Sequence, residues 1–133
     1  MSPAVPTAGA RAVPVSSPAE VPASASLRLR LAALARAAAL WTPGVVGLDA
    51  GRAGIRMTAS GGLRVDGVVC AALPDGRYQA SIHLVVAMVP LRPLADAVRA
   101  QVQRDVTSAG LADRLGPVDI AVENITTAGE IGP

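Results

Sequence analysis

Residues 77–89 alternate apolar and more polar side chains, and this pattern constrains the fold more than any other segment of the chain. Successive side chains of a β-strand point to opposite faces of a sheet, so the alternation predicts a strand with one buried face. Towards the end of the segment both faces become apolar, which leaves apolar surface for a partner. The residues expected on the buried face are Ala80, Ile82, Leu84, Val86 and Met88.

Two other segments have the 3.6-residue period of amphipathic helices. The first covers 27–41 and lies between a candidate N-cap, Ser26, and the helix-ending pair Pro43 and Gly44. Its alternating first residues also fit a strand, but the alanine-rich run that follows favours a helix. The second helix follows Pro90. Its apolar stripe is Leu91, Leu94, Val98, Val102 and Val106.

Shorter patterns complete the expected fold. Residues 54–59 and 63–72 are extended segments separated by a glycine turn, and residues 118–122 alternate again after Pro117. The expected order is therefore helix, three-stranded antiparallel meander, helix and strand. Because the sheet has one strongly apolar face and both helices are amphipathic, we expect an α+β two-layer sandwich with the helices on that face.

The ends of the chain differ in composition from its middle. Residues 1–25 hold five of the 11 prolines, and they predict a disordered Pro/Ala-rich tail that lacks the apolar run of a signal peptide. The folded domain is expected over 26–127, with a flexible C-terminus over 128–133. The longest apolar segments contain arginines or are too short for the roughly 30 Å core of a bilayer, so we expect no direct membrane span.

Composition removes several classes of function. Aromatic residues make up 2% of the chain, and all 12 basic residues are Arg. Without Lys there is no Schiff-base chemistry and no Walker-type phosphate lysine. One Cys and one His allow neither an internal disulfide nor a Cys/His zinc site, and a net charge of +2 is too small to bind nucleic acid by charge alone. We therefore expect a cytoplasmic protein that is not an enzyme and has no catalytic residues, cofactor or metal.

The single His and the single Cys are interpreted as structural residues. His83 lies on the less apolar face of the predicted strand, beside Ser81, but the sequence fixes no acid near it. Cys70 lies in an apolar segment without an adjacent base, which predicts a buried, unreactive thiol. Two GxxG runs, at 44–47 and 51–54, match the loop of a KH nucleic-acid-binding domain, but extended segments adjoin them where that domain has helices.

Charge is distributed unevenly along the chain. Between residues 26 and 64, six Arg against one acid give +5, whereas five Arg against eight acids give −3 between 65 and 133. The two parts either form separate solvated surfaces or allow the basic part to meet the acidic part of a neighbouring copy or an anionic membrane. A head-to-tail contact of this kind gives rings or filaments. The candidate interaction surface consists of Arg28, Arg30, Arg36, Arg52, Arg56 and Arg64.

The order and spacing of these pieces resemble a known family. The run LARAAALWTPGV at 34–45 matches a helix signature that ends in a Pro-Gly-Val turn, and PLADAVRAQVQRDV at 93–106 is similar to a second helix. With the closing loop and strand that begin at Gly110, the arrangement over 27–125 resembles the alkaline shock protein family, the envelope stress response proteins of Gram-positive bacteria. The strand that opens that family's domain and its Tyr-Gly step after the long strand are absent.

The resemblance implies a cytoplasmic scaffold that forms homo-oligomers and is held near the membrane by a small membrane-anchored protein, in support of cell-envelope homeostasis. It supplies no catalytic residues. The use of Arg in place of Lys and the abundance of Ala are typical of a high-GC, actinobacterial-like genome. Two alternatives stay open. One is a small nucleic-acid-binding module that uses Arg52 and Arg56, and the other is an accessory subunit of a metabolic enzyme in fatty-acid precursor synthesis.

Overall fold

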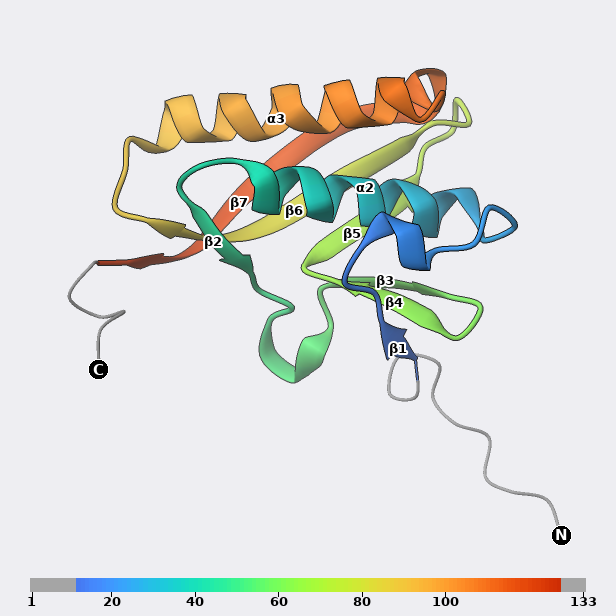
Figure 1. Cartoon of the computed structure of the whole chain (residues 1–133), viewed down its shortest axis with the longest axis horizontal. Helices are drawn as coiled ribbons and strands as arrows, with labels where there is room; N and C mark the ends of the chain where they lie inside the picture. Colours follow the sequence, from blue (N-terminus) through green and yellow to red (C-terminus); the bar gives the residue numbers. More distant parts are fainter. Residues whose placement is uncertain (1–11, 128–133) are drawn as a thin grey trace, which may run out of the picture.

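Strand β6 (Tyr78–Ala87) is the centre of a four-stranded sheet in the computed structural model, which describes residues 12–127 (Figure 1). Strands β2 (Val45–Leu48) and β5 (Val68–Ala72) pair antiparallel with successive parts of one edge of β6. Strand β7 (Leu115–Thr126) pairs parallel along the other edge. The predicted alternation is confirmed over the length of β6, whose inner residues Ala80, Ile82, Leu84 and Val86 are fully buried.

Helices α2 (Leu27–Trp41) and α3 (Leu91–Ser108) cover the buried face of this sheet (Figure 1). The predicted N-cap is confirmed, since the Ser26 hydroxyl accepts a hydrogen bond of 3.2 Å from the Leu29 amide. Four residues of the predicted α3 stripe are buried, whereas Leu91 is exposed because the helix begins there. Met88 is also exposed, because β6 ends at Ala87 and the chain then turns towards α3. The core is therefore aliphatic, as the composition predicts.

The α+β class is confirmed, but the expected order of helix, meander, helix and strand is wrong. The segment predicted over 63–72 divides at Gly67 into β4 (Leu63–Asp66) and β5, which belong to different sheets. Strand β4 pairs antiparallel with β3 (Met57–Ser60) across the glycine turn, as expected, but β2 is a strand that the sequence did not predict. Gly67 has φ +83°, a conformation that lets the chain turn between the two sheets.

Residues 12–25 are part of the fold, in contrast to the disordered tail expected there. Strand β1 (Val13–Pro14) adds to β4 in parallel, and the amides of Val13 and Val15 donate to main-chain carbonyls of the hairpin. Val15 is buried in the core, and the short 3-10 helix η1 (Pro18–Glu20) follows it. The remaining tail, 1–11, and the expected C-terminus over 128–133 lie outside the described residues. Prolines suit an edge strand such as β1, since its outer amides need no partner strand.

Neither α2 nor α3, nor any other helix within residues 12–127, has both the length and the hydropathy of a membrane span.

Candidate functional site

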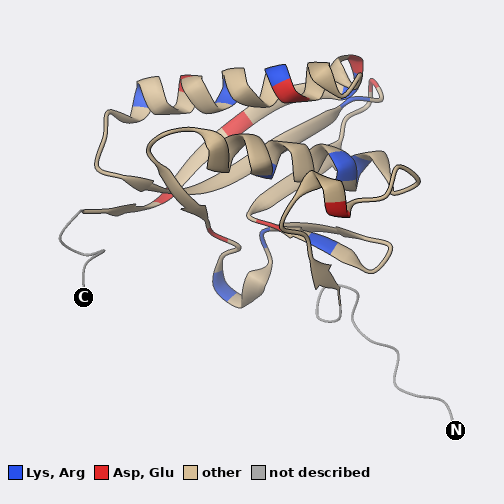
Figure 2. Ribbon diagram, in the orientation of Figure 1, with Lys and Arg blue, Asp and Glu red and all other residues tan. Residues whose placement is uncertain are grey.

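The six arginines predicted as an interaction surface lie on separate elements. Arg28, Arg30 and Arg36 are on α2, and Arg64 is on β4. The other two lie in or next to the short 3-10 helix η2 (Arg52–Gly54), and the basic residues in Figure 2 are correspondingly spread over several elements. The structure thus does not bring them together into one compact basic patch.

Several of these arginines are hydrogen-bonded within the chain. Arg28 donates to the Ala59 carbonyl at 2.8 Å, and Arg36 donates to the Ser16 carbonyl at 3.3 Å. Arg64 donates to the Ala12 carbonyl and forms an ion pair with a neighbouring aspartate. These bonds attach the N-terminal segment and the β3–β4 hairpin to each other and to α2, so a structural role accounts for three of the six.

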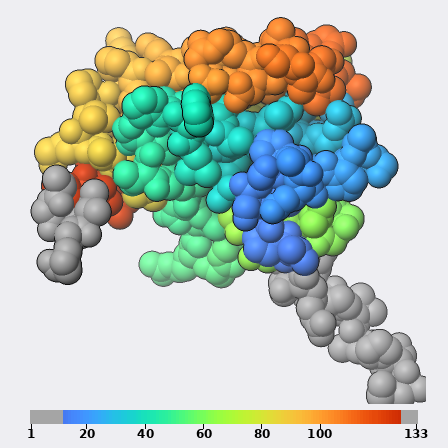
Figure 3. Space-filling model, in the orientation of Figure 1, coloured from blue at the N-terminus to red at the C-terminus, as the bar shows by residue number. Residues whose placement is uncertain are grey.

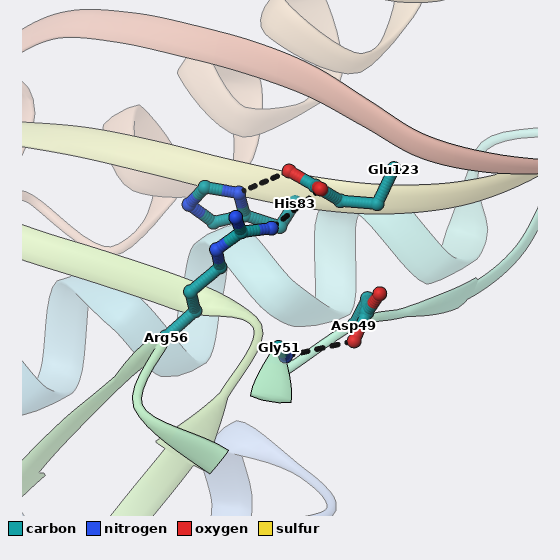
Figure 4. Close-up of polar contacts among 5 residues, drawn as sticks. All are labelled: Asp49, Gly51, Arg56, His83 and Glu123. Carbon is teal, nitrogen blue, oxygen red and sulfur yellow. Dashed lines mark hydrogen bonds and ion pairs between the residues drawn. The ribbon is translucent and has the colours of Figure 1, made fainter. Parts of the chain in front are cut away.

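Arg56 belongs to a polar triad with His83 and Glu123 on the sheet face opposite the helices (Figure 4). His83 Nδ1 lies 2.8 Å from Glu123 Oε2, and Arg56 Nη1 lies 2.5 Å from Glu123 Oε1. The side chains of His83 and Glu123 are only 16% and 22% exposed. The parallel register of β6 and β7 brings Glu123 to His83 across 40 residues of sequence.

The triad holds the loop that connects β2 to β3. The Asp49 amide donates to the His83 carbonyl at 3.0 Å, and the Asp49 carboxylate accepts from the Gly51 amide at 2.7 Å. A Cβ atom on Gly51 would lie 3.1 Å from Cδ of Arg56, so the arginine side chain passes directly over this glycine. The GxxG run at 51–54 therefore forms a turn between two strands, where a KH domain would need a loop between two helices.

The triad consists of an ion pair between Arg56 and Glu123 and a hydrogen bond between His83 and the same carboxylate. Glu123 uses both carboxylate oxygens, one for His83 and one for Arg56. Among residues 12–127, no hydroxyl or thiol group is hydrogen-bonded to the His83 ring, so this part of the chain places no side-chain nucleophile where the His–carboxylate pair would activate it. Nor does this part of the chain hold a group of three His, Cys, Asp or Glu side chains placed for a metal ion.

Replacing Glu123 with Gln is expected to remove a pH-dependent part of the stability. The hydrogen bond from His83, followed by that from Arg56, holds the pKa of Glu123 below its usual value. Because the folded-state pKa is lowered, this contribution is complete above about pH 4.3, the ordinary value for Glu, and is lost as the pH falls further. Denaturation midpoints from pH 7 to pH 3 should converge for wild type and Glu123→Gln at the acidic end. A constant difference would contradict the assignment, and Asp113→Asn, at an exposed acid outside the triad, is the control.

Cys70 is buried, as predicted, and its thiol lies within hydrogen-bonding distance of the buried Thr58 hydroxyl. Burial raises the pKa of Cys70 to about 12, and nearby Arg28 and the Thr58 hydrogen bond oppose this only in part. Relative to an ordinary thiol with a pKa of 9.0, the native protein should therefore form ~1000-fold less thiolate at neutral pH. We expect slow labelling by a disulfide reagent in buffer and rapid labelling in denaturant. Equal rates in both would contradict the buried, unreactive assignment.

The strongest surface feature is apolar and lies where the C-terminal ends of α2, β6 and β7 meet. We call it the Trp41 end surface. Trp41 is 78% exposed and Met88 is 71% exposed. The end of α2 and the β6–α3 link adjoin on the left of Figure 3, and the same region carries little charge in Figure 2. The large apolar side chains that form this surface are Leu40, Trp41, Val46, Met88, Val89, Leu91 and Ile125.

A groove of about 400 Å³ lies within the Trp41 end surface, between the end of α2 and the first turns of α3. Its one polar side chain is Thr42, whose hydroxyl already donates to the Ala38 carbonyl at 2.9 Å, so the wall is apolar. The groove is lined by Thr42, Pro43, Gly44, Val89, Pro90, Pro93, Leu94 and Ala97. Sequence reasoning expected spare apolar surface near the end of β6 but identified neither the groove nor the exposure of Trp41.

Comparison with known proteins yields no relative. No family model matches the chain, and it has no match among curated proteins or solved structures. The resemblance to the alkaline shock protein family therefore stays a prediction.

Proposed function

We propose that the protein is a non-enzymatic adaptor that associates with itself and with a protein partner through the Trp41 end surface. The observation that carries this proposal is that seven exposed large apolar side chains belong to residues 40–46, 88–91 and 125, which the pairing of β2 and β7 with β6 brings to one end of the sheet. Exposing such groups to water is unfavourable, and apolar surface of this kind marks an interaction site. Trp and Met are also enriched in the cores of protein interfaces.

The resemblance noted in the sequence supports a finer form of the same proposal. In that form, the adaptor is cytoplasmic, acts in the envelope stress response and is recruited to the membrane by a small membrane-anchored protein. The surface that would receive this partner is the Trp41 end surface, since the basic residues first considered are dispersed and four of them bond within the chain.

Sedimentation velocity tests the association directly. The wild-type chain has a mass of 13.3 kDa, and we expect its apparent mass to rise with concentration. The double substitution Trp41→Ser and Met88→Ser should shift it towards the monomer. Ile55→Ser is the matched control, because Ile55 is 72% exposed and lies outside the Trp41 end surface. A wild-type chain that stays monomeric up to about 1 mM would contradict self-association.

A further inference from the structure

The Trp41 end surface contains both a protruding side chain and a hollow. Trp41 is the last residue of α2 and is mostly exposed, while the groove begins at the next residue, Thr42. Trp41 is not among the residues that line the groove, so the indole does not fill it. In a two-fold dimer the same surface of both copies meets, so a protruding Trp41 beside a groove on one copy can face the groove of the other.

We propose that two copies of the chain form a two-fold dimer in which Trp41 of each copy inserts into the groove of the other. This inference rests on the proposed self-association and specifies its geometry. The groove presents apolar walls from Pro43, Val89 and Leu94, which suit the large apolar area of an indole ring. A reciprocal contact also closes the assembly at two copies, whereas the head-to-tail contact considered from the charge pattern would continue into rings or filaments.

The exposed apolar area approaches what such a dimer needs. With about 150–250 Å² for the Trp side chain and roughly 60–120 Å² for each of the others, the exposed parts of the seven residues amount to roughly 300–500 Å². A stable dimer buries about 800 Å² on each partner, and the exposed prolines beside the groove contribute towards the remainder. The largest apolar patch on a typical monomer covers about 300–600 Å² and is often a functional surface.

Charge also permits the contact. Residues 37–48 contain no charged side chain, and between residues 84 and 97, where the groove lining ends, the charged side chains are Arg92 and Asp96. Both are exposed, and Asp96 forms an ion pair with Arg99 at 3.4 Å. Because an unpaired charge is costly to bury, the dimer must keep Arg92 and Asp96 at its rim, where water solvates them.

Two single substitutions test the contributions of the Trp41 side chain and of the groove separately. Trp41→Ala removes the protruding indole and leaves the groove intact. Ala97→Arg places a long charged side chain in the groove from an exposed position on α3 and leaves Trp41 intact. Each should weaken the dimer at least about 30-fold, as loss of a central interface residue does. Ile55→Ala should leave it unchanged. Thermal melting followed by circular dichroism shows whether Ala97→Arg lowers the stability of the fold. If it does, Ala97→Gln is used in its place, because it fills the groove with an uncharged side chain.

Mixing the two variants gives the decisive test, because Trp41 is the only tryptophan of the chain. In the mixture, all tryptophan emission comes from Ala97→Arg, and the only intact grooves belong to Trp41→Ala. We expect addition of Trp41→Ala to shift the emission to shorter wavelength and to restore half of the reciprocal contacts. Addition of Ala97→Arg carrying Trp41→Ala should have no effect, since that double variant has neither part.

The outcomes separate this inference from the proposed function. A wild-type chain that is monomeric at all concentrations overturns both. A wild-type dimer that survives both single substitutions, or a pair of defective variants that do not restore each other, overturns only the reciprocal insertion. Emission at short wavelength that is independent of concentration would show that Trp41 packs into its own groove, which also overturns it.

Discussion

Replacing Gly67 with Ala is expected to lower the free energy of unfolding by about 2–5 kcal/mol. Gly67 has φ +83°, which costs an L-residue about 1–2 kcal/mol. A Cβ atom there would also lie 2.5 Å from Cβ of Leu48, which is fixed to the main chain of β2 and cannot rotate away. Relieving this overlap must move the turn between the two sheets, whose amide and carbonyl bond Arg56 and His83 at 2.7 and 2.9 Å.

Gly62→Ala is the matched control for this prediction. Gly62 has nearly the same φ, +82°, but a Cβ atom there would meet nothing within 4 Å. The loss of chain entropy in the unfolded state is the same for both replacements and cancels in the comparison. We therefore expect Gly62→Ala to cost only about 1–2 kcal/mol in chemical denaturation. Equal losses at the two positions would show that the contact with Leu48 carries no energy.

Replacing Thr58 with Val is expected to cost about 2–6 kcal/mol, although the two side chains have nearly the same shape. The fully buried Thr58 hydroxyl donates to the Val68 carbonyl at 2.8 Å and accepts from the Cys70 amide at 2.9 Å. The hydroxyl thereby supplies the hydrogen bonds that a neighbouring strand would otherwise make with this edge of β5. Val leaves both main-chain groups buried and unpaired, at about 1–3 kcal/mol each.

Thr58→Ser distinguishes the hydroxyl from the methyl group. Serine keeps both hydrogen bonds and loses one buried methyl, so the expected loss is only about 1 kcal/mol. Denaturant midpoints with a common slope would measure the two variants on the same scale. A serine variant that is less stable than the valine variant would mean that packing, rather than hydrogen bonding, is what Thr58 supplies.

The sequence predicts those parts of the fold that depend on neighbouring residues. Helix α2 follows from the Ser26 cap, the alanine run and Pro43, and β6 follows from its alternation. The arrangement of strands depends on contacts between residues that are far apart in the sequence, and the predicted strand order is wrong for this reason. Gly67 looks like one more residue of a continuous extended segment, because its positive φ is set by contacts with β2 and β6 that no local pattern records.

The candidate sites show the same division. His83 is correctly assigned to the less apolar face of its strand, but its acid partner is missed because Glu123 meets it only through the parallel pairing of β6 with β7. The excess of Arg between residues 26 and 64 suggests one basic surface, whereas the structure places these arginines on different elements. Trp41 fits the end of a helix equally well as a buried or an exposed residue, and only the fold shows that it protrudes.

The emission of Trp41 across a concentration series of the wild-type chain measures directly whether association buries the Trp41 end surface. We expect emission typical of an exposed indole and efficient acrylamide quenching in dilute solution. Both should change to those of a buried indole as the concentration rises from about 1 µM to 1 mM, in parallel with the apparent mass. Emission that stays that of an exposed indole throughout this range, with a constant monomer mass, would contradict the claim that the Trp41 end surface is built for association.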